Sequence, residues 1–378
     1  MLTTAALRDL RDRLGSTRTL SIFLGESAED PAGRTMGRRT LAHLLDHLQD
    51  DLRGASHAER VACEQAVSHA QERLGEIPFS TRFSGWVAFV TAEAVMYAEM
   101  VPVAMPTRVS WSNGPRLAPY LRAFGLPRPT AVAVMDSASA RLFLWKHGVL
   151  AEQETVTTDL TLGSMDHMGA PPRPGFHTGT RGTSGADVAE QEQRTRLTKH
   201  VHAVGDRLMT LAAADGRVLV GGIPTVAQMM VSHVVSERRG QARVLAGLDV
   251  NDSAAGVAAR TAVAVGEWAQ ELDLADLTAL AEQGYPGGLA AFGLTPVFAA
   301  LRDGAVDRLL ISEHFLDRWP KEVESALELA LDTRAQLRYL TGAAGERLDS
   351  VGGGIAARLR FPVLVPSTTA GLEVQANG

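Results

Sequence analysis

The sequence predicts an α/β protein in which mixed sheets are covered by helices, and three observations support this class. Short apolar runs, such as residues 130–136 and 217–222, alternate with longer stretches of helical spacing. The chain has 378 residues, which suggests two or three domains at roughly 150 residues each. Hydrophobic residues make up 45% and charged residues 21%, and this balance excludes a disordered or collagen-like chain.

The first predicted domain covers residues 1–127. It opens with an amphipathic stretch that favours a helix, followed by an apolar run of the β type at residues 18–25. Leu41, Leu44, Leu45 and Leu48 have helical spacing, so helices are expected near residues 40–52 and 58–74. Three β-rich runs separated by short polar or proline breaks come next, at residues 86–91, 95–101 and 107–111.

The second predicted domain covers residues 128–272. Strands at 130–136 and 140–145 flank a short turn, as a hairpin requires, and a third strand is expected at 149–156. A long helix then carries an apolar stripe of Leu197, Val201, Val204, Leu208 and Leu211. Strands at 217–222 and 242–248 alternate with helices at 225–235 and 253–271, which predicts parallel strand pairing.

The third predicted domain covers residues 273–378. The pattern favours helices at 274–282, 294–301 and 321–339, and strands at 306–312 and 358–365. The formal charge of the chain is −6, and its distribution over the three predicted domains is 0, −1 and −5. No domain is broadly basic, so any contact with RNA must depend on local groups of arginines.

The cysteine content and the N-terminus indicate the cellular compartment. Cys63 is the single cysteine, which excludes a disulfide framework and every Cys-rich zinc module within this chain. The first residues carry charges throughout, unlike a signal peptide, and no stretch approaches the roughly 18 apolar residues of a membrane span. We therefore expect a cytoplasmic protein with no membrane partner.

A glycine- and proline-rich loop at residues 163–185 is the most prominent feature of the sequence. It contains six glycines and three prolines, and Arg173 and Arg181 are its positive charges. Glycines allow a backbone to approach another molecule closely, and Phe176 and His177 could stack on nucleic-acid bases. Long loops are either functional or disordered, and the sequence leaves both interpretations open.

Three weaker patterns were weighed as chemical sites. His43 and His47 are four residues apart on one helix, but no third metal ligand is evident, so two histidines beside a core stripe are favoured over a metal site. The turn at 218–225 resembles a nucleotide-binding turn. It lacks the third glycine of a dinucleotide fingerprint, and it also lacks the lysine of a P-loop. The GTSG of residues 182–185 lacks the spacing of a nucleophile elbow. The sequence thus predicts no metal and no cofactor.

The order of segments along the chain resembles a known family. The series runs from TAVAVMDSASARLFLWKHGVL at 130–150 through the loop, the long helix and RVLVGGIPT at 217–225. It ends with ALRDGAVDRLLIS at 300–312 and GGIAARLRF at 353–361, which are its most specific parts. Residues 130–365 are similar to the bacterial branch of the archaeo-eukaryotic release-factor family, relatives of Pelota and of the hibernation factor Balon.

This resemblance implies a three-domain release-factor-like architecture and a ribosomal site for each domain. The first domain would reach toward the decoding centre, where Arg34, Arg38 and Arg39 form the nearest basic cluster. The second would carry its loop to the peptidyl-transferase centre, and the third would have a fold similar to small ribosomal RNA-binding proteins. The predicted rRNA-contacting residues are Arg173, Phe176, His177, Gly179, Arg181, Gly182, Thr183, Ser184 and Gly185.

The loop departs from the family at the position of the catalytic Gly-Gly-Gln motif. Residues 181–185 read RGTSG, which contains no glutamine, and Gln191 and Gln193 come later on the expected helix. The resemblance therefore implies a ribosome-associated factor that binds the A site without releasing peptide, in hibernation or on stalled ribosomes. An elongation-factor GTPase such as EF-Tu is implied as a delivery partner, and DNA is not an expected partner.

Two other functions stay open from the sequence. One is peptidyl-tRNA hydrolysis in ribosome rescue, with Thr183 or Ser184 placing the water. The other is a non-ribosomal small-molecule or nucleotide-binding protein that uses the turn at 218–225. The sequence does not distinguish idle from stalled ribosomes, and it gives no oligomeric state.

Overall fold

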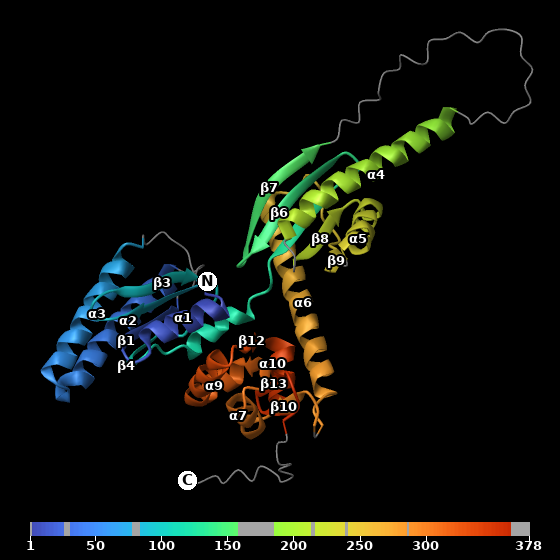
Figure 1. Ribbon diagram of the computed structural model, residues 1–378. Coiled ribbons are helices and arrows are strands. Elements are labelled where there is room, and N and C mark those ends of the chain that lie inside the picture. The colour runs from blue at the N-terminus through green and yellow to red at the C-terminus, as the bar shows by residue number, and fades with distance from the viewer. Residues whose placement is uncertain are drawn as a thin grey trace, which may run out of the picture. The chain divides into compact units, whose positions relative to one another are not determined.

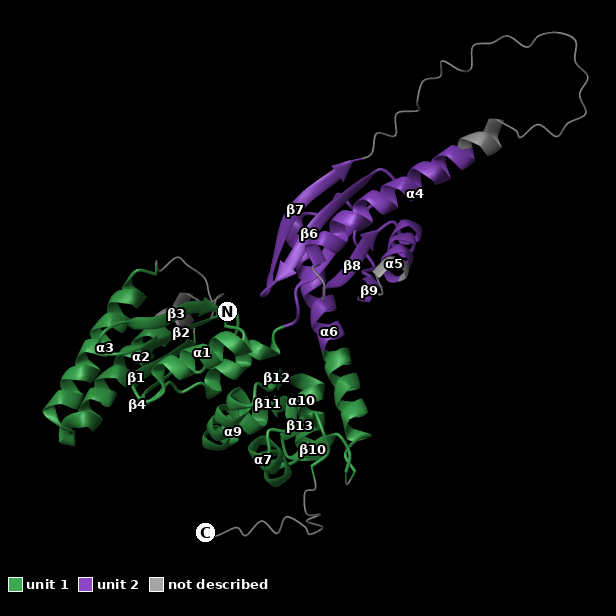
Figure 2. Ribbon diagram, viewed as in Figure 1, with its two compact units in different colours: residues 1–126, 270–378 green, residues 127–269 purple. Residues whose placement is uncertain are grey.

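The computed structural model describes residues 2–25, 31–77, 84–157, 185–212, 216–238, 241–285 and 287–363, and it contains three sheets with covering helices (Figure 1). The described chain divides into two compact units (Figure 2). The first unit comprises residues 1–126 and 270–378, and the second comprises residues 127–269. The predicted α/β class with mixed sheets is confirmed, and the division into three domains at 127 and 272 stays a prediction.

The first sheet of the first unit is antiparallel, in the order β3-β2-β1-β4. Leu20, Ile22 and Leu24 alternate along β1 and pack with the helices α2 and α3, whereas Phe23 points to the opposite face. The elements of this part are α1 (Thr4–Leu14), β1 (Arg18–Gly25), α2 (Pro31–Asp51), η1 (Leu52–Gly54), α3 (His57–Gly75), β2 (Gly85–Val90), β3 (Val95–Val101), β4 (Arg108–Asn113) and η2 (Ala118–Gly125).

The other sheet of the first unit is mixed, in the order β10-β13-β11-β12, with the pair β11·β12 parallel. One apolar core joins this part to the N-terminal part, because Leu7 and Leu10 of α1 share a cluster with Leu327 and Leu331 of α9. The elements are α7 (Leu294–Arg302), α8 (Glu313–Arg318), α9 (Pro320–Asp332), α10 (Gly342–Gly352), β10 (Ala290–Phe292), β11 (Val306–Ser312), β12 (Gln336–Leu340) and β13 (Ile355–Leu359).

The second unit contains one mixed sheet of five strands, in the order β7-β6-β5-β8-β9. The pairs β5·β8 and β8·β9 are parallel and the other two are antiparallel. The elements are β5 (Thr130–Met135), β6 (Ser139–Lys146), β7 (Val149–Thr157), α4 (Gly185–Ala212), β8 (Arg217–Gly222), α5 (Pro224–Arg238) and β9 (Gln241–Val244). The helix α6 (Ala254–Ala281) begins in this unit and ends in the first unit.

Several helix boundaries differ from the sequence-based expectation. The two helices expected at 253–271 and 274–282 are one continuous helix, α6, since no proline or glycine interrupts residues 267–281. The helix expected at 321–339 ends at Asp332, and residues 336–340 form the strand β12. Arg334 has a φ of 58°, a left-handed conformation that stops the helix and that the residue type does not signal. The helix α10 was not expected from the sequence. The helix α2 begins nine residues before its predicted start. The strand β13 ends at Leu359 rather than near residue 365.

Candidate functional site

The predicted loop lies between β7 and α4 of the second unit. Its residues Arg173, Phe176, His177, Gly179, Arg181, Gly182, Thr183 and Ser184 fall outside the described part of the chain. Gly185 is described as the first residue of α4. The described site is therefore the pair of elements that flank the loop and the contacts that hold them.

Residues 190–195 of α4, which precede the packed part of the helix, form an exposed arm about 9 Å long at the helical rise. Its side chains from Glu190 to Thr195 are exposed, so the sheet does not stabilise this segment by burial. Two ion pairs one turn apart support it instead. Glu190 contacts Arg194 at 2.6 Å and Glu192 contacts Arg196 at 3.8 Å.

Beyond the arm, α4 packs against the sheet through the apolar stripe seen in the sequence. Val201, Val204 and Leu208 are buried against Ala133 of β5 and Val218 of β8. Burying side chains of this size contributes about 1.5–3 kcal/mol each, so this half of the helix is anchored. The packed half fixes the direction in which the arm leaves the sheet.

His200 is the buried polar residue at the start of this packed half. Its ring hydrogen-bonds the backbone of Ser139, and the carboxylate of Asp136 acts on it electrostatically. Burial lowers the pKa of His200 and outweighs those two stabilising contacts. Burial also opposes ionisation of Asp136. The N–H groups of Ala138 and Ser139 each donate to the Asp136 carboxylate at 2.7 Å. These hydrogen bonds outweigh burial and lower the pKa of Asp136 below its ordinary value.

Ion pairs tie the strand β7 to the rest of the second unit. Arg207 of α4 contacts Glu154 of β7 at 2.5 Å, so the two elements that flank the loop are linked directly. Both side chains are about half exposed, and pairs of this kind contribute roughly 0–1 kcal/mol.

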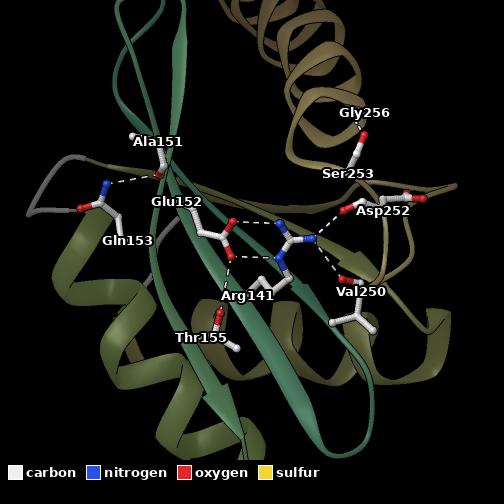
Figure 3. Close-up of polar contacts among 9 residues, drawn as sticks. All are labelled: Arg141, Ala151, Glu152, Gln153, Thr155, Val250, Asp252, Ser253 and Gly256. Carbon is white, nitrogen blue, oxygen red and sulfur yellow. Dashed lines mark hydrogen bonds and ion pairs between the residues drawn. The ribbon is translucent and has the colours of Figure 1, made fainter.

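Arg141 of β6 makes the most extensive polar contacts in this unit (Figure 3). Its guanidinium binds both carboxylate oxygens of Glu152, at 2.9 and 2.8 Å, and donates to the carbonyls of Val250 and Asp252 at 3.1 and 2.5 Å. The side chain is 17% exposed and also lies over the ring of Phe143. The shared hydrogen bonds raise the pKa of Arg141 and lower that of Glu152. The hairpin of β6 and β7 is thereby fixed to the segment that precedes α6.

The turn at 218–225 uses its glycines for the packing of the chain itself. Gly222 has a φ of 108°, and a Cβ atom there would lie 1.9 Å from the carbonyl oxygen of Met135. Ile223 donates its N–H to the same carbonyl at 3.0 Å. Close approach of the strands β5 and β8 therefore accounts for Gly222, while a Cβ atom at Gly221 would lie 2.9 Å from the side chain of Leu248.

The other residues singled out in the sequence lie in the first unit. Arg34, Arg38 and Arg39 belong to α2. Arg39 is exposed, Arg38 is half-buried and already engaged, and the side chain of Arg34 is outside the described part. His43 and His47 are exposed with ring centroids 4.4 Å apart. Within the described ranges, no group of three or more His, Cys, Asp or Glu side chains is placed to hold a metal ion.

Two further observations limit the chemistry of the described residues. Burial, with smaller contributions from the charges of Glu64 and Glu59, raises the pKa of Cys63 to about 11, so this thiol is not an activated nucleophile. Among the helices in the described ranges, none combines the length and apolar character needed to cross a bilayer.

Sequence reasoning missed the contacts that support the loop. Arg141, Glu152 and Glu154 are charged residues within runs that were predicted as neighbouring strands of a hairpin. Opposite charges on adjacent strands are a signal for cross-strand pairing and could have indicated the pair Arg141–Glu152. The contact between Arg207 and Glu154 joins residues 53 positions apart, and no local pattern signals it.

Comparisons with known proteins concern mainly the second unit. Residues 115–269 match the family model described as bacterial archaeo-eukaryotic release factor family 10. No curated protein matches the chain. This segment includes the whole sheet β7-β6-β5-β8-β9, the arm and the loop between β7 and α4.

Solved structures of translation factors were also found. Archaeal Pelota, from a model of the ribosome-bound protein with ABCE1, is 16% identical and has a TM-score of 0.44, with 74% of this chain and 78% of that chain covered. Dom34 of S. cerevisiae, described as a translation termination-like factor that interacts with Hbs1, is 15% identical, with a TM-score of 0.40 and coverage of 64% and 65%.

The archaeal termination factor aRF1 is 18% identical, with a TM-score of 0.24 and coverage of 95% and 99%. The similarity of sequence thus lies in residues 115–269, which the family model matches directly. The similarity to bacterial archaeo-eukaryotic release factor family 10 thus covers the segment 115–269, which is less than half of the chain.

Proposed function

We propose that this protein is a ribosome-associated translation factor that occupies the A site and does not release the nascent peptide. The observation that carries the proposal is the family match over the loop-bearing unit, combined with a loop sequence that has no glutamine between residues 158 and 185. A hibernating or stalled ribosome is the proposed target. Archaeal Pelota is described as ribosome-bound, and Dom34 is described as a factor of RNA quality control.

The described architecture of the second unit supports this use of the loop. The strand β7 and the helix α4 are linked by the pair Arg207–Glu154, and the arm extends beyond the sheet with its side chains in solvent. An exposed arm on a packed base would let a loop of small residues enter an RNA cavity while the base stays outside. Arg173 and Arg181 would contact rRNA phosphates, and Phe176 and His177 would stack on bases.

The glutamine side chains nearest the loop are Gln191 and Gln193, which are exposed on the arm. They follow the loop tip by six residues or more, so they would not replace the glutamine that hydrolytic relatives carry at the tip. The proposal therefore expects binding without hydrolysis. A cytoplasmic location belongs to the same proposal, as does an elongation-factor GTPase of the EF-Tu type facing the acidic C-terminal segment of net charge −5.

Co-sedimentation with purified ribosomes tests the binding. The intact protein should pellet with ribosomes at low salt, and the double variant Arg173→Ala/Arg181→Ala should bind more weakly. The slope of log affinity against log salt should fall by about 2, since each arginine–phosphate contact contributes about 1. The matched control is Arg13→Ala/Arg347→Ala, which removes two exposed arginines outside the loop and outside the basic cluster of α2. Failure of the intact protein to pellet with ribosomes would overturn the proposal.

A release assay tests the absence of hydrolysis. Stalled complexes that carry labelled peptidyl-tRNA should retain their peptide when the protein is added, as they do with a variant that lacks residues 163–185. Release above that control, lost in Thr183→Ala or Ser184→Ala, would identify a peptidyl-tRNA hydrolase instead. Electron microscopy of the same complexes would show whether the A site is occupied.

A further inference from the structure

A cavity of about 570 Å³ lies within the first unit. The strand β4 and residues 116–119 line one side of it, and the helix α9 lines the other. Cavities of roughly 300–1,000 Å³ are typical of small-molecule sites. The buried side chains of Phe23 and Ala118 line it, together with the half-buried Pro119 and Pro320. The walls are thus partly apolar, as in most sites that hold an organic ligand.

Three cationic side chains from three separate segments converge on this cavity. They are Arg108 of β4, Arg116 before η2, and Lys321 in the first turn of α9. Arg108 and Lys321 make no hydrogen bond or ion pair with any acidic side chain in the described ranges. Arg116 acts through its charge on Glu324. Two of the three cations are therefore available to a ligand.

The acidic residues of the cavity do not cancel this positive charge. Glu324 is 7% exposed, and its two carboxylate oxygens accept the N–H groups of Leu117 and Ala118 at 2.7 and 2.9 Å. Backbone donors thus already satisfy it. Glu328 is exposed at the rim, and Ser110 and Ser325 add hydroxyl donors. The cavity therefore favours an anion that accepts several hydrogen bonds.

We propose that this cavity binds a small phosphorylated molecule such as a nucleotide. The phosphate groups would lie at Arg108, Arg116 and Lys321, because guanidinium and ammonium groups bind phosphate through charge-assisted hydrogen bonds. The ring would lie against Pro119 and Pro320. A volume of about 570 Å³ fits a free small molecule better than an extended RNA backbone. This site is separate from the loop and does not depend on the proposed ribosomal function.

Calorimetric titration of the intact protein without ribosomes tests the site. The probes are inorganic phosphate, pyrophosphate and the nucleoside diphosphates ADP and GDP. A nucleoside diphosphate should bind at least about tenfold more tightly than inorganic phosphate, a difference of about 1.4 kcal/mol. The variant Arg108→Gln/Lys321→Gln should weaken this binding by at least about tenfold. Both side chains are exposed, so the variant should unfold at the same temperature as the parent protein.

The matched control is Arg39→Gln/Arg347→Gln, which changes the net charge equally at exposed positions outside the cavity. It should leave nucleotide binding unchanged. Equal weakening by both double variants would overturn the proposal, since it would show a non-specific charge effect. Absence of heat with every probe at about 1 mM, where even weak sites are partly occupied, would also overturn it. Competition by single-stranded RNA that is lost only in Arg108→Gln/Lys321→Gln would assign the cations to RNA.

Discussion

Partly exposed arginines join distant parts of the chain in both units, and in the first unit a buried glutamate does so as well. Glu324 accepts hydrogen bonds from residues 207 and 206 positions away and lies among apolar side chains. Arg141 and Arg207 join segments of the second unit through pairs that water can reach. The first unit thus adds one buried contact of large expected effect to arginine pairs such as Arg122–Asp317, whereas the elements beside the loop are held by the more exposed contacts of Arg141 and Arg207.

The largest effect is expected from removing the buried carboxylate. Glu324→Ala leaves the N–H groups of Leu117 and Ala118 buried without acceptors, so the free energy of unfolding of the first unit should fall by about 3 kcal/mol. Urea unfolding measures this change. Glu322→Ala, two residues earlier and half-exposed, is the control and should change stability by less than about 0.5 kcal/mol. Equal effects of the two variants would show that the carboxylate of Glu324 is not the connection.

A smaller loss is expected from Arg141 in the second unit. Arg141→Gln removes the paired bonds to Glu152 and the donors to Val250 and Asp252, so stability should fall by about 2 kcal/mol. Hydrogen exchange of residues 249–253 should accelerate with it. Arg207→Gln breaks the more exposed pair with Glu154 and should cost less than about 1 kcal/mol. A larger effect of Arg207→Gln would reverse the ranking of these contacts.

Acid should act in opposite directions on the two units. Burial lowers the pKa of His200 below its ordinary 6.5, so its contribution is present above pH 6.5 and is lost as the pH falls below that value. Burial raises the pKa of Glu324 above 4.5, so keeping this side chain ionised costs the first unit stability at neutral pH, and protonation relieves that cost as the pH falls toward 4.5.

Hydrogen-exchange rates of separate peptides, measured between pH 7.5 and 5, report the stability of each unit on its own. The exchange rate of the unfolded chain at each pH is the reference. The variant His200→Gln should remove the acid dependence of the second unit, while His202→Gln, an exposed neighbour, should retain it. The same acid dependence in both variants would show that another group is responsible. The change in stability between pH 7.5 and 5 should be smaller than the losses expected for Glu324→Ala and Arg141→Gln.

The smallest effect is expected in the arm. Glu190→Gln/Glu192→Gln removes both one-turn ion pairs, each worth about 0.3–0.5 kcal/mol, from a segment whose residues 190–195 are exposed. Hydrogen exchange of residues 190–196 should accelerate, while exchange of residues 200–208 should not change. Unchanged exchange in the arm would mean that its helical state does not depend on these pairs.

The sequence predicted strands well where the apolar runs are short and bounded. The strands at 18–25, 130–135 and 306–312 lie where they were expected, because buried β-branched and leucine runs leave little choice of face. The segment QLRYL at 336–340 has apolar spacing that fits a helix as well as a strand. Its pairing with β11, a tertiary contact, decides for the strand. The helix α6 was likewise predicted as two helices, with the boundary near Asp273. In the structure Asp273 lies inside the helix and binds Arg338 of β12, another tertiary contact.

The site was predicted in part. Composition identifies the loop and its arginines, since glycine and proline are local signals. The apolar stripe of α4 predicts the face that packs on the sheet, and the exposure of residues 190–195 was not predicted. The clamp of Arg141 and the carboxylate of Glu324 depend on partners 109–207 residues away, which no single-sequence pattern indicates.

The discontinuous first unit has a consequence for synthesis of the chain. Leu7 and Leu10 of α1 share their core with Leu327 and Leu331 of α9, so this cluster forms only after the C-terminal segment has left the exit tunnel. The second unit is contiguous and can fold while translation continues. A nascent chain halted near residue 290 would thus carry a folded loop-bearing unit and an exposed α1 face. Such an intermediate would be a natural client of chaperones that bind apolar helices.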